Sequence, residues 1–285
     1  MHFHRLAAIA VLTSTAYAGN ESSATAPVEA PVKSIFSGDL TLTIANQYNT
    51  RGLIIQDDGV TFQPALNLYA NVHKGEGFIN SASLILGLWS DVSKETDVSD
   101  PGDAGHFTEF DYGLGFTFNF AKRWSFTSFY NLWTSPADGY GDGSWINATI
   151  AYDDTGLLGE NFSLKPYLIV LRDLGGEAGT GLEKNSWYFE PGIRPNYTFF
   201  SGSSTPVNLG LLIKAGLGEK FYAGETYGYL AAGPQVSVPL GFIDPSAGKW
   251  TVSAGYLVYD FGSTLEAFNG RSHDHLATVS LSVSF

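Results

Sequence analysis

The stretch FDYGLGFTFNF, residues 110–120, alternates large apolar side chains with small or polar ones at every position. The even positions hold only large apolar residues: Phe110, Tyr112, Leu114, Phe116, Phe118 and Phe120. The odd positions are Asp, Gly, Gly, Thr and Asn. A period of two predicts a β-strand. Six large apolar residues on one face are too many for the interior of a small barrel. They fit a surface against lipid, with the polar face toward a lumen.

The same alternation recurs along the chain and divides it into twelve segments. The predicted strands lie near residues 39–51, 59–73, 77–92, 106–120, 123–135, 143–155, 160–172, 184–200, 206–218, 224–239, 248–262 and 272–285. An even number of strands, each long enough to cross a bilayer, predicts an all-β fold: one closed antiparallel transmembrane β-barrel. Ten or fourteen strands are the alternatives. Closure follows because an open sheet edge in lipid would leave backbone groups unsatisfied.

Composition narrows the class of protein. The chain has 285 residues, of which 44% are hydrophobic and only 15% charged. This apolar content excludes a disordered chain. The absence of cysteine excludes a disulfide scaffold, thiolate metal sites and a cysteine nucleophile. The formal charge of -13 argues against nucleic acid as a partner, because no basic surface remains to contact phosphates.

The N-terminus has the pattern of a secretory signal, residues 1–18. Arg5 is followed by a short apolar run, and Ala16-Tyr17-Ala18 fits a cleavage site after Ala18. A short N-terminal membrane anchor is the alternative, but the run is too short to span a bilayer. Residues 19–37 are rich in small residues without periodicity and predict a flexible periplasmic tail. The barrel is expected over 38–285.

Connection lengths predict the orientation of the barrel. Short turns after the second, fourth and sixth segments alternate with longer loops rich in Asp and Gly, which predicts that both termini face the periplasm. Acidic residues gather in the longer loops. They predict either a solvated surface or a negative rim, which would bind divalent cations together with outer-membrane glycolipid or favour the entry of cations. The six tryptophans lie near predicted strand ends, where interfacial girdles are expected.

The chain ends in Phe285, with an apolar residue at every second position before it. This pattern resembles the C-terminal strand of bacterial outer-membrane proteins. The resemblance implies an outer-membrane location in a Gram-negative bacterium. It also implies recognition by the barrel-assembly machinery and partners in the membrane's lipid and glycolipid.

A second resemblance lies near the start of the barrel. Tyr48, Arg51 and Gly52 are followed by a short polar loop and by Gln63-Pro64-Ala65-Leu66. This arrangement is similar to the opening of the TorF-type porins. The resemblance implies an outer-membrane barrel with a transport role, and it implies no catalytic residue.

Charged residues that point into the lumen are the candidate site. Strand parity places six charged side chains on lumen faces: Glu109, Asp111, Glu190, Arg194, Lys214 and Arg51. A lumen charge must be hydrated or paired, because desolvating it alone is costly. The charges therefore predict either a hydrated pore whose field tunes passage or a salt-bridge network in a filled barrel. Oligomeric state does not follow from the pattern.

The function expected from these features is a porin-like channel for passive diffusion of small hydrophilic solutes or ions. A plugged structural or adhesion barrel is the alternative, and a hydrolase at the rim is a weaker one. Its candidates are His273, Asp274, His275 and His106. His273 and Asp274 are adjacent and point to opposite faces, which is poor geometry for a dyad. We expect no enzyme activity, cofactor or metal.

Overall fold

The computed structural model describes residues 35–57, 59–93, 106–137, 139–203 and 205–285. The expected signal peptide and nearly all of the expected tail lie outside this range. Twelve long strands form the wall of a barrel: β1 (Phe36–Ala45), β4 (Thr61–Lys74), β5 (Ile79–Val92), β6 (Phe107–Phe120), β7 (Trp124–Thr134), β8 (Gly143–Tyr152), β10 (Tyr167–Gly176), β11 (Trp187–Ile193), β13 (Val207–Leu217), β14 (Tyr227–Pro239), β15 (Lys249–Phe261) and β16 (His273–Ser284).

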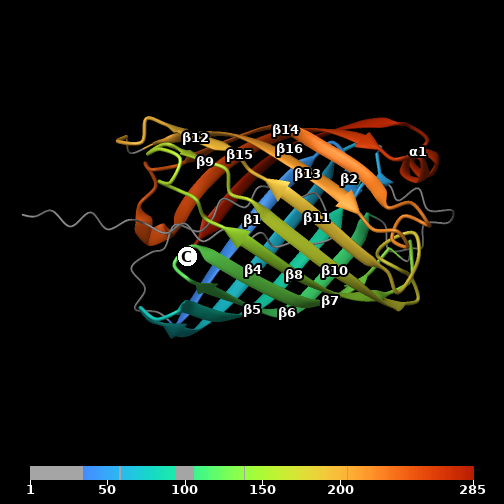
Figure 1. Ribbon diagram of the computed structural model, residues 1–285, viewed down its shortest axis with the longest axis horizontal. Helices are drawn as coiled ribbons and strands as arrows, with labels where there is room; N and C mark the ends of the chain where they lie inside the picture. The colour runs from blue at the N-terminus through green and yellow to red at the C-terminus, as the bar shows by residue number, and fades with distance from the viewer. Residues whose placement is uncertain (1–34, 58, 94–105, 138, 204) are drawn as a thin grey trace, which may run out of the picture.

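Each wall strand pairs antiparallel with its neighbours, so the predicted all-β, twelve-stranded closed barrel is confirmed (Figure 1). The first and last strands meet, with Leu40 opposite Val283 in the β1–β16 pair. The ring is completed by β11 and β13, where Gly192 lies opposite Lys214. Closure leaves no strand edge exposed to lipid.

Two expected strands, 160–172 and 184–200, are each divided in two. β9 (Phe162–Ser163) precedes β10, β12 (Asn196–Phe199) follows β11, and the two short strands pair with each other. The breaks fall at Lys165-Pro166 and at Arg194-Pro195. Proline has no N–H to donate to a sheet, and Lys165 has a φ of 47°.

The two ends of the barrel differ in construction. At the turn end, on the left of Figure 1, short connections join the strands and the chain terminates. One of these connections contains the 3-10 helix η1 (Pro245–Ala247). At the loop end, the connections are longer, and the helix α1 (Ser263–Asn269) lies between β15 and β16. No helix in the described part of the chain is long and apolar enough to cross a membrane.

The connection between β1 and β4 forms a hairpin of its own. Strand β1 ends at Ala45, rather than at residue 51 as the alternation predicts, and β2 (Tyr48–Thr50) pairs with β3 (Leu53–Gln56). We call β2 and β3 the plug hairpin. Arg51 and Gly52, with φ of 52° and 83°, form its tip. Two successive positive φ values are what a tight hairpin turn requires, and glycine supplies one without strain.

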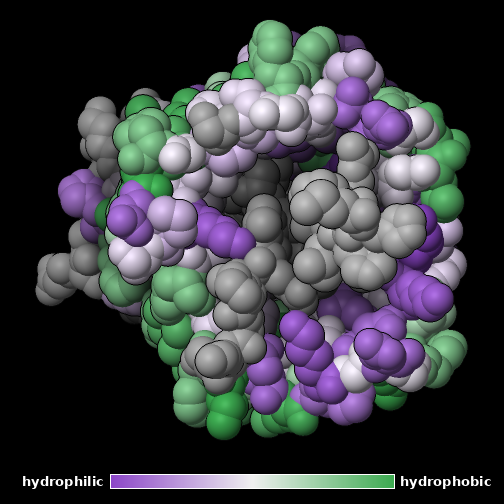
Figure 2. Space-filling model, turned by 90° about the vertical axis from the view of Figure 1, so that its left-hand side faces the viewer, coloured by the Kyte–Doolittle hydropathy of each residue, from purple (hydrophilic) through white to green (hydrophobic). Residues whose placement is uncertain are grey.

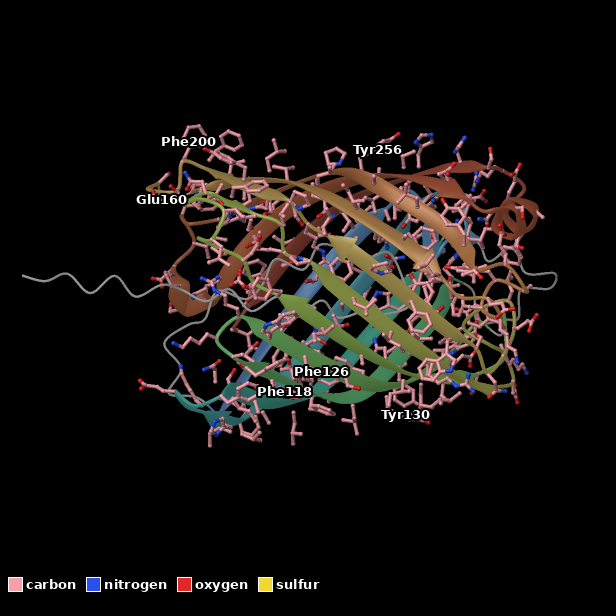
Figure 3. All side chains as sticks on the ribbon, in the orientation of Figure 1. Phe118, Phe126, Tyr130, Glu160, Phe200 and Tyr256 are labelled. Atoms are coloured by element: carbon pink, nitrogen blue, oxygen red, sulfur yellow. The ribbon has the colours of Figure 1, made fainter. Side chains whose placement is uncertain are left out.

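The outer surface of the barrel is apolar, as the alternation predicts. Leu114, near the middle of β6, is 68% exposed, and Leu84 on β5 is 56% exposed. Phe118 and Phe126 project outward from adjacent strands, and their ring centroids are 5.2 Å apart (Figure 3). A protein in water would not leave such a belt uncovered, whereas lipid covers it.

The interior of the barrel at the loop end is packed rather than purely polar. Trp145, Tyr188, Phe221 and Tyr222 are fully buried there, in one cluster with Leu265 of α1. This corrects the expected tryptophan girdle. Three of the six tryptophans lie inside: Trp89, Trp133 and Trp145 are buried, whereas Trp124 and Trp187 are exposed. Strand position alone does not distinguish a ring that faces lipid from one that faces the plug hairpin.

Candidate functional site: a lumen in two parts

The plug hairpin lies inside the loop-end half of the barrel, against acidic residues of the wall. Tyr48 is fully buried, and its ring lies 5.5 Å from that of Trp89. Its hydroxyl donates to Glu109 Oε2 over 2.7 Å. Tyr140, in the loop between β7 and β8, donates to the same carboxylate oxygen. Glu109 is therefore held by two phenols from two different loops.

Arg51 lies at the tip of the plug hairpin, not on the wall. Its guanidinium is 5.4 Å from the ring of Trp145, and its backbone carbonyl accepts from the Tyr222 hydroxyl over 3.0 Å. Asp111 is fully buried nearby, where the positive charge of Arg51 acts on it. Among the described residues, neither carboxylate oxygen of Asp111 has a hydrogen-bond partner. Arg51 therefore supplies positive charge near Asp111, while the Glu109 carboxylate acts on Asp111 in the opposite sense.

Helix α1 fixes the other side of the plug hairpin. The Asn269 side chain accepts from Ile54 N over 3.1 Å and donates to the carbonyl of Gly52 over 2.8 Å. A Cβ at Gly52 would approach Leu265 Cδ1 to 2.6 Å and Tyr229 Cδ1 to 2.7 Å. The hairpin tip thus lies tightly between α1 and the wall, with no room for a side chain at Gly52.

Glu190 on β11 is the centre of a second buried network. Its carboxylate accepts hydrogen bonds from the hydroxyls of Tyr188, Tyr229 and Tyr167, over 2.5, 2.7 and 3.1 Å respectively. Lys214 Nζ on β13 lies 3.5 Å from Glu190 Oε2. Both charged side chains are almost fully buried, so this ion pair is shielded from water.

The turn-end half of the barrel contains a cavity of about 550 Å³, which we call the vestibule. Figure 2 views this end and shows hydrophilic side chains around a hollow. Its polar lining comes mainly from inward positions of six strands and the segments beside them: Asn161, Ser163, Asn196, Asn208, Gln235, Ser237, Thr251, Ser282 and Ser284. The vestibule is large enough to hold a small solute with its water.

Three cations and one carboxylate also line the vestibule: Lys165, Arg194, Lys249 and Glu160. The Arg194 guanidinium lies 4.6 Å from the centroid of the Tyr167 ring. Its Nε is buried and has no hydrogen-bond partner in the part of the chain that the structure describes. Tyr167 links the two halves, because its hydroxyl contacts Glu190 in the packed half.

The six residues predicted from strand parity therefore fall into separate groups. Glu109, Asp111 and Arg51 lie at the plug hairpin, Glu190 and Lys214 form the buried pair, and Arg194 lies in the vestibule. Lys165 and Lys249 were missed. Lys249 shares the parity of Thr251, so its orientation was readable, whereas Lys165 lies at a strand break that parity cannot describe.

The rim histidines lie on the outer surface of the barrel. His273 Nδ1 is 3.1 Å from Asp260 Oδ1 on the neighbouring strand, and His275 Nδ1 is 2.9 Å from the Tyr256 hydroxyl. Asp274 points inward instead, where Gln47 donates to it. His106 is exposed at the start of β6. Among the described residues, no group of three His, Asp or Glu side chains is placed to hold a metal ion.

Comparison with known proteins gives the fold but no family. No protein-family model matches the chain, and neither does any curated protein sequence, so the likeness to the TorF-type porins is not confirmed.

Several solved structures match over most of the chain. An outer-membrane channel from Pseudomonas putida F1 has a TM-score of 0.53 at 10% identity, covering 90% of this chain and 97% of that one. A bacterial polysaccharide outer-membrane secretin has a TM-score of 0.51 at 6% identity, and the match covers 89% of this chain and 99% of the secretin chain. The β domain of the Bordetella autotransporter BrkA has a TM-score of 0.50 at 13% identity, and the match covers 87% of this chain and 98% of the β domain. The chain therefore has the fold of bacterial outer-membrane barrels, and its apolar belt suits that location.

Proposed function

We propose that this protein is an outer-membrane channel for passive diffusion of small hydrophilic solutes, with a lumen restricted by the plug hairpin. The observation that carries the proposal is the polar vestibule of about 550 Å³ inside a lipid-facing barrel. A barrel that served only as a membrane anchor would gain nothing from such a cavity. Similarity to an outer-membrane channel from Pseudomonas putida F1 supports the proposal at the level of the fold.

In this proposal the turn end faces the periplasm and the loop end faces the exterior. The signal peptide is removed after Ala18, and the C-terminal strand ending in Phe285 is presented to the assembly machinery. Solutes enter the vestibule from the periplasmic side or leave through it. They cross the packed half when the plug hairpin moves away from the wall.

Movement of the plug hairpin breaks several polar contacts and exposes the buried side chains of Tyr48 and Leu53. Tyr48 binds Glu109, Tyr222 binds the carbonyl of Arg51, and Asn269 binds both strands of the hairpin. Each neutral hydrogen bond contributes about 1 kcal/mol, and one to a carboxylate contributes somewhat more. Displacement of the hairpin is therefore costly, and in this proposal it gives rare, brief openings.

The experiment is single-channel recording of the refolded mature protein in planar bilayers, beside a variant in which residues 47–57 are replaced by a short Gly-Ser linker. We expect small, brief conductance steps from the complete protein and larger, longer steps from the variant. Shortening the turn 200–206 is the matched control and should leave the steps unchanged. A correctly folded barrel that never conducts, with or without the plug hairpin, would contradict the proposal.

A plugged structural barrel is the second candidate, and the buried network around Glu190 and Lys214 favours it. Inward charges that pair with one another are what a permanently filled lumen requires. This candidate predicts no conductance from the complete protein and lower stability once the hairpin is removed. The same pair of recordings therefore separates the two candidates.

A further inference from the structure

The vestibule is basic, although the chain as a whole is acidic. The sequence has 28 acidic residues against 15 Lys and Arg. The vestibule reverses this balance, with Lys165, Arg194 and Lys249 against Glu160. A concentration of one sign of charge within a narrow, low-dielectric wall strengthens the local field and attracts ions of the opposite sign.

Two further carboxylates near Lys165 are engaged by the backbone. Asp153 and Asp154 both act electrostatically on Lys165, and so does Arg194. Asp154 accepts from the backbone N–H groups of Leu164 and Lys165, over 2.8 and 2.9 Å. Asp153 accepts from the backbone and hydroxyl of Thr155. Neither aspartate lines the cavity, so both moderate the basic field without placing a carboxylate inside it.

Arg194 lines the vestibule and carries a buried N–H group that has no partner in the described part of the chain. Its Nε is buried and lacks a hydrogen-bond acceptor among the described residues. A guanidinium offers several donors in one plane, a geometry that matches the oxygen pair of a carboxylate or phosphate. Amides and hydroxyls of the lining, such as Asn161 and Gln235, can add donors to the same anion.

The acidic residues of the lumen are already occupied, and most lie in the packed half. Asp39, on the inward face of β1 at the turn end and opposite Ser284, accepts from Asn67 and Tyr69. Glu190 is paired with Lys214 and three tyrosine hydroxyls, and Glu109 is held by two phenols. Both lie in the packed half, beyond Tyr167. The charged side chains that line the vestibule itself are three cations against Glu160. This excess of positive charge favours anions, because the charges that line a pore influence which ions concentrate there.

We infer that the vestibule is a binding site for small oxyanions, that is, organic carboxylates and phosphates, and that it makes the channel anion-selective. Binding of oxyanions follows from the cavity alone, whereas anion selectivity of the channel rests on the proposed function. Arg194 and Lys165 supply the principal contacts to the anion, and Lys249 adds to the field from β15, three strands further round the barrel.

Binding is tested by isothermal titration of the detergent-refolded protein with inorganic phosphate, with choline chloride as the cation probe. We expect millimolar or tighter phosphate binding and none of choline. Arg194→Gln and Lys165→Gln should each weaken phosphate binding at least tenfold, while Arg194→Lys retains part of it. The controls are Lys74→Gln and Lys122→Gln, exposed turn-end lysines outside the cavity lining, and they should bind as the unaltered protein does.

Selectivity is tested by the reversal potential of single channels in a potassium chloride gradient. We expect preference for chloride, reduced or abolished in the Arg194→Gln and Lys165→Gln double variant. Phosphate binding without conductance would overturn the proposed function and leave the site standing. Conductance with cation preference and no phosphate binding would overturn this inference and leave the channel standing. Loss of phosphate binding in the control variants would also overturn it, because the effect would then not come from the vestibule.

Discussion

At the scale of the residue, buried charges in this barrel are compensated by aromatic hydroxyls as much as by opposite charges. Glu190 has three phenol donors besides Lys214, and Lys214 Nζ also lies 5.7 Å from the centroid of the Tyr229 ring. A carboxylate buried among such partners is stable only while all of them are present, because one lost partner leaves an uncompensated charge.

Replacing Lys214 by Met should therefore destabilise the barrel by about 3 kcal/mol, since breaking a buried pair from one side leaves the other charge desolvated. The free energy of unfolding, measured by urea titration in lipid vesicles with tryptophan fluorescence, tests this. Combining Lys214→Met with Glu190→Gln should recover a large part of the loss. If the double variant is less stable than the single one, the two residues do not act as a pair.

A second prediction concerns Glu225, in the loop between β13 and β14. Partial burial alone would raise its pKa, but hydrogen bonds from Thr264 and Ser263 at the start of α1 outweigh that effect. They hold the pKa of Glu225 below its ordinary value of 4.5. A lowered pKa contributes stability above the ordinary value, and this stability is lost as the pH falls through the folded-state pKa.

Hydrogen exchange in residues 263–269 should therefore become faster as the pH falls below 4.5 and through the lowered pKa of Glu225, beyond the intrinsic pH dependence of exchange. In Glu225→Gln this extra acceleration of exchange at low pH should disappear, because glutamine at position 225 does not titrate. Glu266→Gln is the matched control, since Glu266 lies on the same helix and the contacts to Ser263 N and Thr264 N are made by Glu225 instead. An equal acceleration of hydrogen exchange at low pH in Glu225→Gln would show that another group sets the pH dependence of α1.

At the scale of the element, the plug hairpin decides how the lumen is filled. Alternation predicts a wall strand through Arg51, but β1 ends at Ala45 and the next residues turn inward. The reason lies in pairing: Tyr48, Leu53 and Gln56 are buried against the wall and α1, contacts that exist only once the barrel has closed. A local pattern carries no information about such contacts.

Gly52→Ala should displace the plug hairpin. The position has a φ of 83°, and a Cβ there would lie 2.6 Å from Leu265 and 2.7 Å from Tyr229. We expect longer channel openings in planar bilayers and a loss of stability of more than 1 kcal/mol, because strained backbone and overpacking add. Gly77→Ala is the control, since a Cβ there meets nothing within 4 Å. Unchanged openings in Gly52→Ala would mean that the hairpin does not restrict the lumen.

At the scale of the whole molecule, the apolar belt separates the lipid-facing surface from the ends of the barrel. Leu114 lies near the middle of β6 on that belt, whereas Leu157 lies in a turn-end connection and is 53% exposed. Both leucines are exposed, so burial within the protein does not distinguish them. Their surroundings do, because one contacts hydrocarbon and the other contacts water in the proposed orientation.

Leu114→Arg should therefore destabilise the barrel in lipid vesicles by about 2–4 kcal/mol, the cost of a cation near the bilayer midplane. Leu157→Arg should cost less than about 1 kcal/mol, because it lies outside the hydrocarbon. Urea titration in vesicles measures both. Similar costs at the two sites would contradict the proposed position of the membrane.

The sequence by itself favoured twelve strands over ten or fourteen, determined the apolar outer face and placed Glu109, Asp111, Glu190 and Lys214 inward. These follow from a period of two, which every residue of a strand obeys whatever its neighbours do. The same period places Trp133 and Trp145 inward, opposite Asp111 and Asn131, but it does not tell whether the lumen at that height holds water or protein.

Only the tertiary structure decided that the plug hairpin fills one half of the lumen and that the other half is a basic vestibule. Both depend on contacts between segments far apart in the chain, such as Arg51 with Tyr222 and Asn269 with Gly52. Lys165 and Arg194 likewise meet because the two strand breaks at Pro166 and Pro195 lie at the same end of adjacent strands. Closure of the barrel creates these neighbours, and no local spacing encodes them.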